Sequence, residues 1–266
     1  MIFMENNKSK ETLSTHSYWN ESYVNAKHLP IVQSMNSIGM TSLDQIFKKH
    51  LPRGDSFRFI ELGCSPGGWM HYFAKNFLYR VSGIDYTKDG VTVARKNLKI
   101  LNIDAVVIED DVFSYNPTEK FDIVFSAGLI EHFSGGKLQE LVDKHIELCK
   151  NGGYVVLTIP NLSGINKILQ KIASEDVFEI HNTDIMNLQF FKNIVSSQSN
   201  LVEDIFIGYA GKIDFGLFNG KLFYLRIGYI LQFFFNFLVL KLKIDIPECK
   251  YVSPYIVAIF KKKKNV

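Results

Sequence analysis

The sequence predicts an α/β fold in which one doubly wound, mostly parallel sheet is covered by helices on both faces. Short runs rich in β-branched and aromatic residues alternate along the chain with segments whose apolar residues recur every three or four positions. The short runs are apolar at nearly every position, which is typical of strands buried on both faces. Because strands that alternate with helices form parallel sheets, both observations favour the same architecture.

The expected elements follow one another in a regular order. Five strands are predicted at residues 57–62, 81–85, 105–109, 122–127 and 154–159. Helices are predicted between them at residues 69–77, 91–101 and 138–149. Residues 161–200 predict loop and helix laid over the sheet, and two last strands are expected at 201–210 and 253–260. The expected sheet therefore has seven strands.

The N-terminal part differs in composition from this alternating core. Residues 1–52 predict a polar lead-in and an amphipathic cap helix at 42–51, with Ser42 as its N-cap. A length of 266 residues suits one α/β domain, and no Ser/Gly/Pro-rich linker divides the chain. We expect residues 53–266 to form that domain, with a hydrophobic helical insertion near residues 221–243.

The composition restricts the class of protein. The chain is 47% hydrophobic and 21% charged, so it is neither disordered nor of low complexity. The chain has 30 basic and 27 acidic residues. Four of the lysines form the run 261–264, which predicts a solvated tail. No nucleic-acid partner is expected, because such proteins usually carry a broad basic surface. Three widely spaced cysteines favour a reducing compartment, and early charges argue against a signal peptide, so cytoplasmic localisation is expected.

Residues 222–240 form an apolar stretch close to the length of a membrane span. Arg226, Gln232 and Asn236 interrupt it at helical spacing, so they line one narrow stripe together with Tyr229. A lone span should not keep such a stripe. We expect an amphipathic helix that packs on the protein itself and closes the acceptor pocket, or that contacts a membrane interface or a second subunit.

A glycine-rich loop follows the first predicted strand. Glu61, Gly63, Ser65 and Gly67 are spaced as acid-x-Gly-x-Ser-x-Gly directly before a predicted helix. Glycines allow a sharp turn and a close approach of the backbone to a ligand. Asp85 ends the second strand about 20 residues after Gly63, the spacing at which a carboxylate reaches the hydroxyls of a ribose.

Together with the segments that follow it, this loop resembles that of the class I S-adenosylmethionine-dependent methyltransferases. The similar segments come in the family's order: EDDVF after the third strand, FDIVFSAGLIEHF through the fourth, LCKNGGYVVLTIPN into the fifth and SPYIVAIF at the end. EHF is most similar to the ubiquinone-biosynthesis-type and sugar-modifying small-molecule methyltransferases. Ser65 departs from the family's middle glycine but keeps a small side chain. The resemblance covers residues 15–260 and implies a Rossmann-like sheet with an antiparallel last strand.

The resemblance also implies a reaction and a set of site residues. It implies S-adenosylmethionine as cofactor and a small-molecule, sugar or lipid-linked acceptor that is methylated on oxygen. The methionine moiety is expected near Glu61, the ribose near Asp85, and the adenine near Asp111. The full set of expected cofactor-binding residues is Glu61, Gly63, Cys64, Gly67, Asp85, Tyr86, Asp111, Val112, Ser126 and Ala127.

Three alternatives share parts of this pattern. RNA ribose methyltransferases of the heat-shock-induced type have a loop like SPGGW, but their fifth strand carries a catalytic lysine that YVVLTIPN lacks. A dinucleotide-binding dehydrogenase uses the same crevice, but Pro66 and the carboxylate of Glu61 suit a pyrophosphate poorly. The third alternative, a non-catalytic binding module that keeps the cofactor site, is not excluded by the sequence.

Methyl transfer to a hydroxyl needs alignment of the reactants and an acceptor for the proton. His132, just after the fourth strand, is the first candidate base, because imidazole titrates near neutral pH. The alternative is a structural histidine with Glu131 as its partner. His181 is a second candidate, in a segment expected to cover the site. No spacing typical of metal ligands accompanies these residues, so no metal is expected.

Two aromatic residues near the N-terminus are also candidates for the site. Tyr18 and Trp19 in HSYWNESY resemble the aromatic pair with which many family members fold their N-terminal segment over the cofactor. The alternative is a tryptophan that anchors the core, and both roles are compatible.

Overall fold

The computed structural model describes residues 11–25, 38–212, 230, 231, 233, 234, 237, 241, 242 and 247–264. Its centre is a seven-stranded sheet with the order β3-β2-β1-β4-β5-β7-β6. The strands are β1 (Arg58–Leu62), β2 (Arg80–Asp85), β3 (Ala105–Glu109), β4 (Phe121–Ala127), β5 (Cys149–Pro160), β6 (Val202–Ala210) and β7 (Tyr255–Lys262). All seven predicted strands are present, so the predicted α/β class is confirmed.

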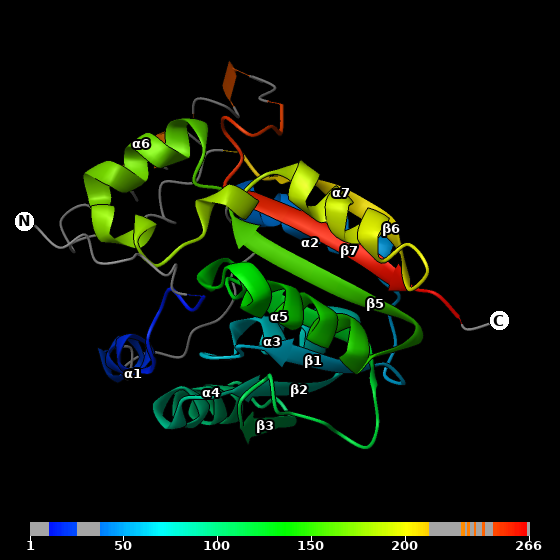
Figure 1. Ribbon diagram of the computed structural model, residues 1–266. Helices are drawn as coiled ribbons and strands as arrows, with labels where there is room; N and C mark the ends of the chain where they lie inside the picture. Colours follow the sequence, from blue (N-terminus) through cyan, green and yellow to red (C-terminus); the bar gives the residue numbers. More distant parts are fainter. Residues whose placement is uncertain are drawn as a thin grey trace, which may run out of the picture.

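The strand directions also agree with the prediction. β1 pairs in parallel with β2 and β4, β2 with β3, and β4 with β5, while β7 runs antiparallel between β5 and β6. Figure 1 shows the β5 and β7 arrows side by side and pointing in opposite directions. This is a doubly wound Rossmann-like sheet with one reversed strand.

The end of β7 differs from the prediction of a solvated lysine tail at 261–264. Lys261 and Lys262 pair within the sheet, and the ammonium of Lys262 donates to the carbonyl oxygens of Ile146 (2.7 Å) and Cys149 (2.9 Å). Antiparallel pairing with β5 and β6 continues past the apolar run, because backbone hydrogen bonds do not depend on the side chain. The first lysines of the run are therefore part of the fold.

The predicted core helices are present with slightly earlier starts: α3 (Gly68–Phe77), α4 (Lys88–Ile100) and α5 (Gly135–Leu148). The hydroxyl of Thr87 accepts a hydrogen bond from the backbone of Gly90 and so caps α4. A short 3₁₀ turn, η1 (Ile130–His132), follows β4. The region after β5 contains α6 (Gly164–Ala173), η2 (Glu175–Phe178), η3 (Thr183–Ile185) and α7 (Leu188–Ser197).

The cap region corrects one expectation and adds one element. Helix α2 (Ile38–His50) begins before Ser42, so Ser42 lies within the helix and is not its N-cap. The apolar stripe starts earlier than predicted: Met40 is buried with Leu43 and Phe47, and the helix extends far enough to present all three to the core. A further helix, α1 (His16–Asn25), was not predicted and lies apart from the sheet in Figure 1.

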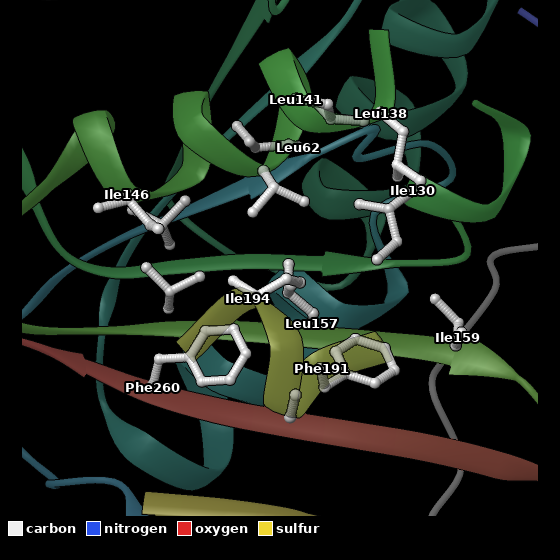
Figure 2. Close-up of a cluster of buried hydrophobic side chains, with 14 of the residues drawn as sticks. Leu62, Ile130, Leu138, Leu141, Ile146, Leu157, Ile159, Phe191, Ile194 and Phe260 are labelled. Carbon is white, nitrogen blue, oxygen red and sulfur yellow. The ribbon is translucent and has the colours of Figure 1, made fainter. Parts of the chain in front are cut away.

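The core forms two hydrophobic clusters, one on each face of the sheet. Alternate strand residues point to opposite sides, so Val124 and Leu157 belong to one cluster and Phe125 and Val156 to the other. Figure 2 shows the first cluster, in which Leu138, Leu141 and Ile146 of α5 and Phe191 and Ile194 of α7 pack on the sheet. Helices α2, α3 and α4 cover the other face.

The apolar stretch at residues 222–240 is described only in part. Residues 230, 231, 233, 234 and 237 are helical, and so are 241 and 242 just beyond it. Their apolar side chains are exposed, from 46% for Leu231 to 71% for Phe233. The predicted stripe of Arg226, Tyr229, Gln232 and Asn236 lies outside the described residues. Within the described part of the chain, none of the helices has the length and apolar character needed to cross a membrane.

Candidate functional site

A cavity of about 710 Å³ opens at the carboxyl ends of β1, β2 and β4. Ligands of open α/β sheets bind at this edge, where the strand order reverses. The cavity is lined by the loop after β1, by the residues that follow β2, β3 and β4, and by the N-terminal residues 12–19. Of the expected site residues, those that line it are Gly63, Asp85, Tyr86, Asp111, Val112, Ala127 and His132.

The loop after β1 takes the sharp turn that its glycines predict. Gly63 and Gly67 have φ values of 71° and 92°, which residues with a Cβ atom rarely adopt. The backbone N–H groups of Gly63 and Cys64 both donate to the carbonyl of Ile84 (2.9 and 3.0 Å). The loop is therefore fastened to the end of β2, with Gly63 and Ser65 on the cavity surface.

Gly83 in β2 supports this loop from below, and it is not among the site residues predicted from the sequence. A Cβ at Gly83 would lie 2.5 Å from the Cβ of Cys64 and 2.6 Å from the sulfur of Met70. Cys64 itself is fully buried in the hydrophobic cluster that α3 covers, so its side chain does not line the cavity. The missed signal is a glycine inside a strand, which often marks a close approach of another segment.

Asp85 connects the end of β2 to the loop. One of its carboxylate oxygens accepts hydrogen bonds from the backbone N–H (2.9 Å) and the hydroxyl (2.6 Å) of Thr87. The other accepts from the backbone N–H of Ser65 (3.3 Å). Burial raises the pKa of Asp85, and these hydrogen bonds oppose that shift. The carboxylate is thus held in one orientation at the cavity wall.

Glu61 lies behind the loop rather than on the cavity surface. It is buried in β1, and its Oε2 has no hydrogen-bond partner among the described residues. Burial raises the pKa of this carboxyl well above its usual value, and the backbone N–H of Met70 acts in the opposite direction. A buried oxygen without a partner is costly, so it is ready to accept a hydrogen bond or a positive charge.

The residues after β2 and β3 form one end of the cavity. Tyr86 is 43% exposed, and its ring meets the ring of His16 edge-on at 5.0 Å. Asp111 folds its carboxylate back onto the backbone N–H of Phe113 (3.0 Å). Val112 and Phe113 add an apolar surface, and neither Phe113 nor the nearby Lys137 was expected there from the sequence.

Of the two residues expected at the end of β4, only Ala127 lines the cavity. The Ser126 hydroxyl is turned inward, 2.9 Å from Nε2 of His145, and both residues are buried. Nδ1 of His145 lies 2.7 Å from the carbonyl of Leu141. This pair links β4 to α5 beneath the site.

His132 and His181 lie side by side although they are far apart in the sequence. Nδ1 of His132 contacts the carbonyl oxygen of Ile180, the residue before His181, across a separation of 48 residues. Their ring centroids are 4.5 Å apart. Burial, and to a smaller extent the neighbouring His181, lowers the pKa of His132 to about 3. The ring is therefore neutral near neutral pH and only a weak base. The prediction of His132 as general base assumed an imidazole pKa near neutrality, and burial removes that property.

Glu131 precedes His132 in the turn η1. It is fully buried, and neither of its carboxylate oxygens has a hydrogen-bond partner among the described residues. Burial raises its pKa to about 8. One ligand atom from each of Glu131, His132 and His181 lies within 4.8 Å of the other two.

The N-terminal segment forms part of the cavity wall. Leu13 donates its backbone N–H to the carbonyl of His132 (2.9 Å), and Trp19 donates its indole N–H to the hydroxyl of Ser14 (2.9 Å). The Trp19 ring meets the His132 ring edge-on at 4.9 Å and lines the cavity. Tyr18 packs on Trp19 but is not part of the lining, so only one member of the expected aromatic pair faces the cavity.

Comparison with known proteins agrees with this architecture. Residues 59–153 match a protein-family model described as a methyltransferase domain. No curated protein matches the chain. The matched segment runs from β1 into β5 and includes the glycine-rich loop, Asp85 and His132.

Several solved structures share the fold. The N-methyltransferase NodS from Bradyrhizobium japonicum WM9, in complex with S-adenosyl-L-homocysteine, is 10% identical over 91% of this chain and 97% of that chain, with a TM-score of 0.53. Geranyl diphosphate C-methyltransferase from Streptomyces coelicolor A3(2) is 15% identical over 84% and 76% of the two chains, with a TM-score of 0.55. The plantazolicin methyltransferase BpumL is 17% identical over 93% and 90%, also with a TM-score of 0.55. At these identities the likeness concerns the fold.

Proposed function

We propose that this chain, a class I S-adenosylmethionine-dependent methyltransferase, transfers the methyl group to an oxygen atom of a small or lipid-linked acceptor, with a sugar or phenolic hydroxyl as the preferred class. The observation that supports the cofactor site most directly is the orientation of Asp85. Its carboxylate is fixed by Thr87 and Ser65 at the wall of a cavity of about 710 Å³. A cavity of this size lies within the range of about 300–1,000 Å³ that is typical of small-molecule sites.

In this proposal the loop side of the cavity binds the cofactor. Asp85 accepts hydrogen bonds from the ribose hydroxyls, which can use the lone pairs that Thr87 and Ser65 leave free. Asp111 and Val112 are placed beside the adenine, and Gly63 lets the backbone approach the methionine moiety. Glu61 acts from behind the loop, where its unpartnered oxygen attracts the positive amino group.

The opposite side of the cavity is proposed to receive the acceptor. Trp19, Leu129, Phe113 and Phe133 give it an apolar, largely aromatic lining. Such a surface suits a ring or an apolar chain better than a highly charged nucleic acid. His132 and His181 remain the candidate catalytic residues, since they lie beside this surface.

S-adenosylhomocysteine binding tests the cofactor site. We expect the purified full-length protein to bind this product in a calorimetric titration, and Asp85→Asn to bind it at least about 30-fold more weakly, because charge-assisted hydrogen bonds contribute about 1.5–3 kcal/mol each. Asp104→Asn removes an exposed carboxylate elsewhere and serves as the matched control. A folded protein that does not bind at millimolar ligand, or that binds equally well as Asp85→Asn, contradicts the proposed site.

The acceptor atom needs a separate experiment. Cell extracts incubated with the enzyme and a cofactor carrying an isotopically labelled methyl group should yield a labelled small molecule or lipid. Mass spectrometry with fragmentation then identifies the methylated atom. A label on nitrogen or carbon would leave the methyltransferase intact and overturn the assignment to oxygen.

A lipid-linked acceptor is supported by the exposed helical residues of the apolar stretch. Phe233, Phe234 and Phe237 expose 71%, 56% and 51% of their surface, and each large apolar side chain gains about 1.5–3 kcal/mol when it leaves water. We therefore expect the enzyme to float with liposomes. A variant with these three residues changed to serine should stay in the soluble fraction. If the native enzyme also stays there, the stretch packs on protein and membrane contact is contradicted.

A further inference from the structure

A cluster of ionisable side chains lies beside the cavity, on the side away from the glycine-rich loop. Glu131 and His132 belong to the turn η1 after β4, and His181 belongs to the segment between η2 and η3. One potential ligand atom of each residue lies within 4.8 Å of the others. Within the described ranges of the chain, no second group of three histidine, cysteine or acidic side chains converges in this way.

The carboxylate of Glu131 is the first sign that this cluster has a ligand. The residue is 0% exposed, and both oxygens lack a hydrogen-bond partner among the described residues. A carboxylate buried without a partner is expensive, and native proteins usually pair such a group or use it to coordinate a metal. A Cβ built on Gly128 would lie 3.6 Å from Oε1 of Glu131, so the carboxylate lies against a residue of the cavity wall.

The orientation of the two histidine rings is the second sign. Nδ1 of His132 lies 2.8 Å from the carbonyl oxygen of Ile180, and Nδ1 of His181 lies 2.7 Å from that of Val177. A carbonyl can only accept, so both rings carry their proton on Nδ1. Each Nε2 then presents a lone pair. Metal-binding histidines usually have this arrangement, with the second ring nitrogen donating to a backbone carbonyl or a carboxylate.

We propose that Glu131, His132 and His181 bind one divalent transition-metal ion of the zinc class at the edge of the cavity. Two imidazole nitrogens and one carboxylate oxygen are a donor set that zinc and its first-row neighbours prefer over calcium or magnesium. With metal–ligand bonds of about 2.0–2.2 Å, ligand atoms are separated by roughly 3–3.5 Å. Since the ligand atoms now lie within 4.8 Å of one another, the widest pair has to close by about 1–2 Å when the ion enters.

The ion would also complete the chemistry of the proposed function, on which this part of the inference rests. Three protein ligands leave at least one coordination position, and His132 brings the site to the cavity surface. An acceptor hydroxyl in that position loses its proton to water more easily. Its oxygen then forms the bond to the methyl carbon, while the carbon–sulfur bond breaks and S-adenosylhomocysteine leaves.

Titration of the chelator-treated, full-length protein with zinc chloride tests the site. We expect one equivalent to bind and to raise the melting temperature. Glu131→Gln and His181→Gln should each weaken binding at least about 100-fold, since loss of even a supporting partner of a ligand costs about 10–100-fold. His71→Gln, on α3 outside the cluster, should bind zinc like the native chain. Cobalt(II) in place of zinc should give a visible absorption spectrum that both cluster variants lose.

Folding and cofactor binding are controlled in the same samples. Glu131→Gln should be no less stable than the metal-free native protein, because a neutral amide is cheaper to bury than a carboxylate. Both cluster variants should still bind S-adenosylhomocysteine, so loss of zinc binding alone supports the metal site. The metal site is contradicted if the folded native protein does not bind zinc, or if Glu131→Gln and His181→Gln both bind zinc as tightly as the native protein does. Loss of S-adenosylhomocysteine binding by the native protein would instead contradict the proposed cofactor site.

Discussion

The cavity has two walls that are built in different ways. The loop wall consists of Gly63 and Ser65, in the loop that connects β1 to α3, and of Ile84 and Asp85, at the end of the neighbouring strand β2. The histidine wall consists of Leu129, His132 and Phe133, held by residues 12–19 and by the segment around His181. Each wall has a buried glutamate with an oxygen that finds no hydrogen-bond partner among the described residues: Glu61 lies behind the first wall and Glu131 behind the second.

The difference teaches where a site can be recognised from its sequence. The loop wall depends on glycines at positive φ and on an acid at the end of the next strand, all within a short stretch of chain. The histidine wall depends on contacts between segments far apart in the sequence, such as the backbone hydrogen bond of 2.6 Å from Asn182 to Glu131. Perturbations of the two walls should therefore have different consequences.

The largest effect is expected at Gly83, beneath the loop wall. A methyl group there overlaps Cys64 and Met70, so Gly83→Ala should cost about 1–3 kcal/mol or more in the free energy of unfolding and weaken S-adenosylhomocysteine binding. Chemical denaturation and calorimetry measure both. Combining it with Cys64→Gly should recover part of the binding. Gly136→Ala adds the same methyl group at the start of α5, where the nearest atom is a carboxylate oxygen of the exposed Glu11 side chain at 3.2 Å, and should cost much less because that side chain can move. An equal loss in both variants would show that overlap with Cys64 and Met70 is not the cause.

The next effect concerns His145, which lies beneath the end of β4, the strand that leads into the histidine wall. Burial lowers the pKa of His145 from 6.5 to about 4. The unfolded chain takes up a proton at a higher pH than the folded one, so stability is full above pH 6.5 and falls as the pH drops toward 4, by up to about 3 kcal/mol. His145→Gln should flatten this part of the pH–stability curve, measured by denaturation at several pH values. The partly exposed His50 provides the control, since His50→Gln should leave most of the slope.

A smaller effect is expected at Asn182, which ties the histidine wall together. Its amide donates to the carbonyl of Phe133 (2.9 Å) and its oxygen caps η3. Asn182→Ala should cost about 1–2 kcal/mol and speed hydrogen exchange at residues 130–133. Asn187→Ala removes a similar cap, from α7, without touching the wall. If both variants change exchange at 130–133 equally, Asn182 does not act on the wall specifically.

The smallest effect is expected at Trp19. Of the two tryptophans, Trp19 lines the cavity and Trp69 packs among aromatic rings such as Phe47 and Phe125. Bound S-adenosylhomocysteine should change the tryptophan fluorescence. Trp19→Phe should remove most of that change while lowering affinity less than tenfold, because the ring is replaced by a smaller aromatic one. A signal that persists in Trp19→Phe and disappears in Trp69→Phe would place the ligand away from α1.

Much of the fold was accessible from the sequence because its signals are local. The strand runs are apolar at nearly every position, and all seven appear in the structure with shifts at their ends. Boundaries were less accessible: β7 continues into the lysine run, and α2 begins before Ser42. In both cases pairing or packing with distant residues, rather than the local pattern, decides where the element ends.

By itself the sequence determined the α/β sheet and the turn of the loop wall, because hydrophobic periodicity and glycine spacing act within a few residues of chain. Its motifs also resemble those of methyltransferases, and residues 59–153 match a methyltransferase-domain model. Only the tertiary structure decided the rest of the site. Folding buries Cys64 and Ser126 and brings His181 against His132. It also turns Glu131 inward, where its carboxylate has no hydrogen-bond partner in the described part of the chain. Burial then changes the chemistry: it lowers the pKa of His132 to about 3 and raises that of Glu131 to about 8, because a charge loses its hydration when water is excluded.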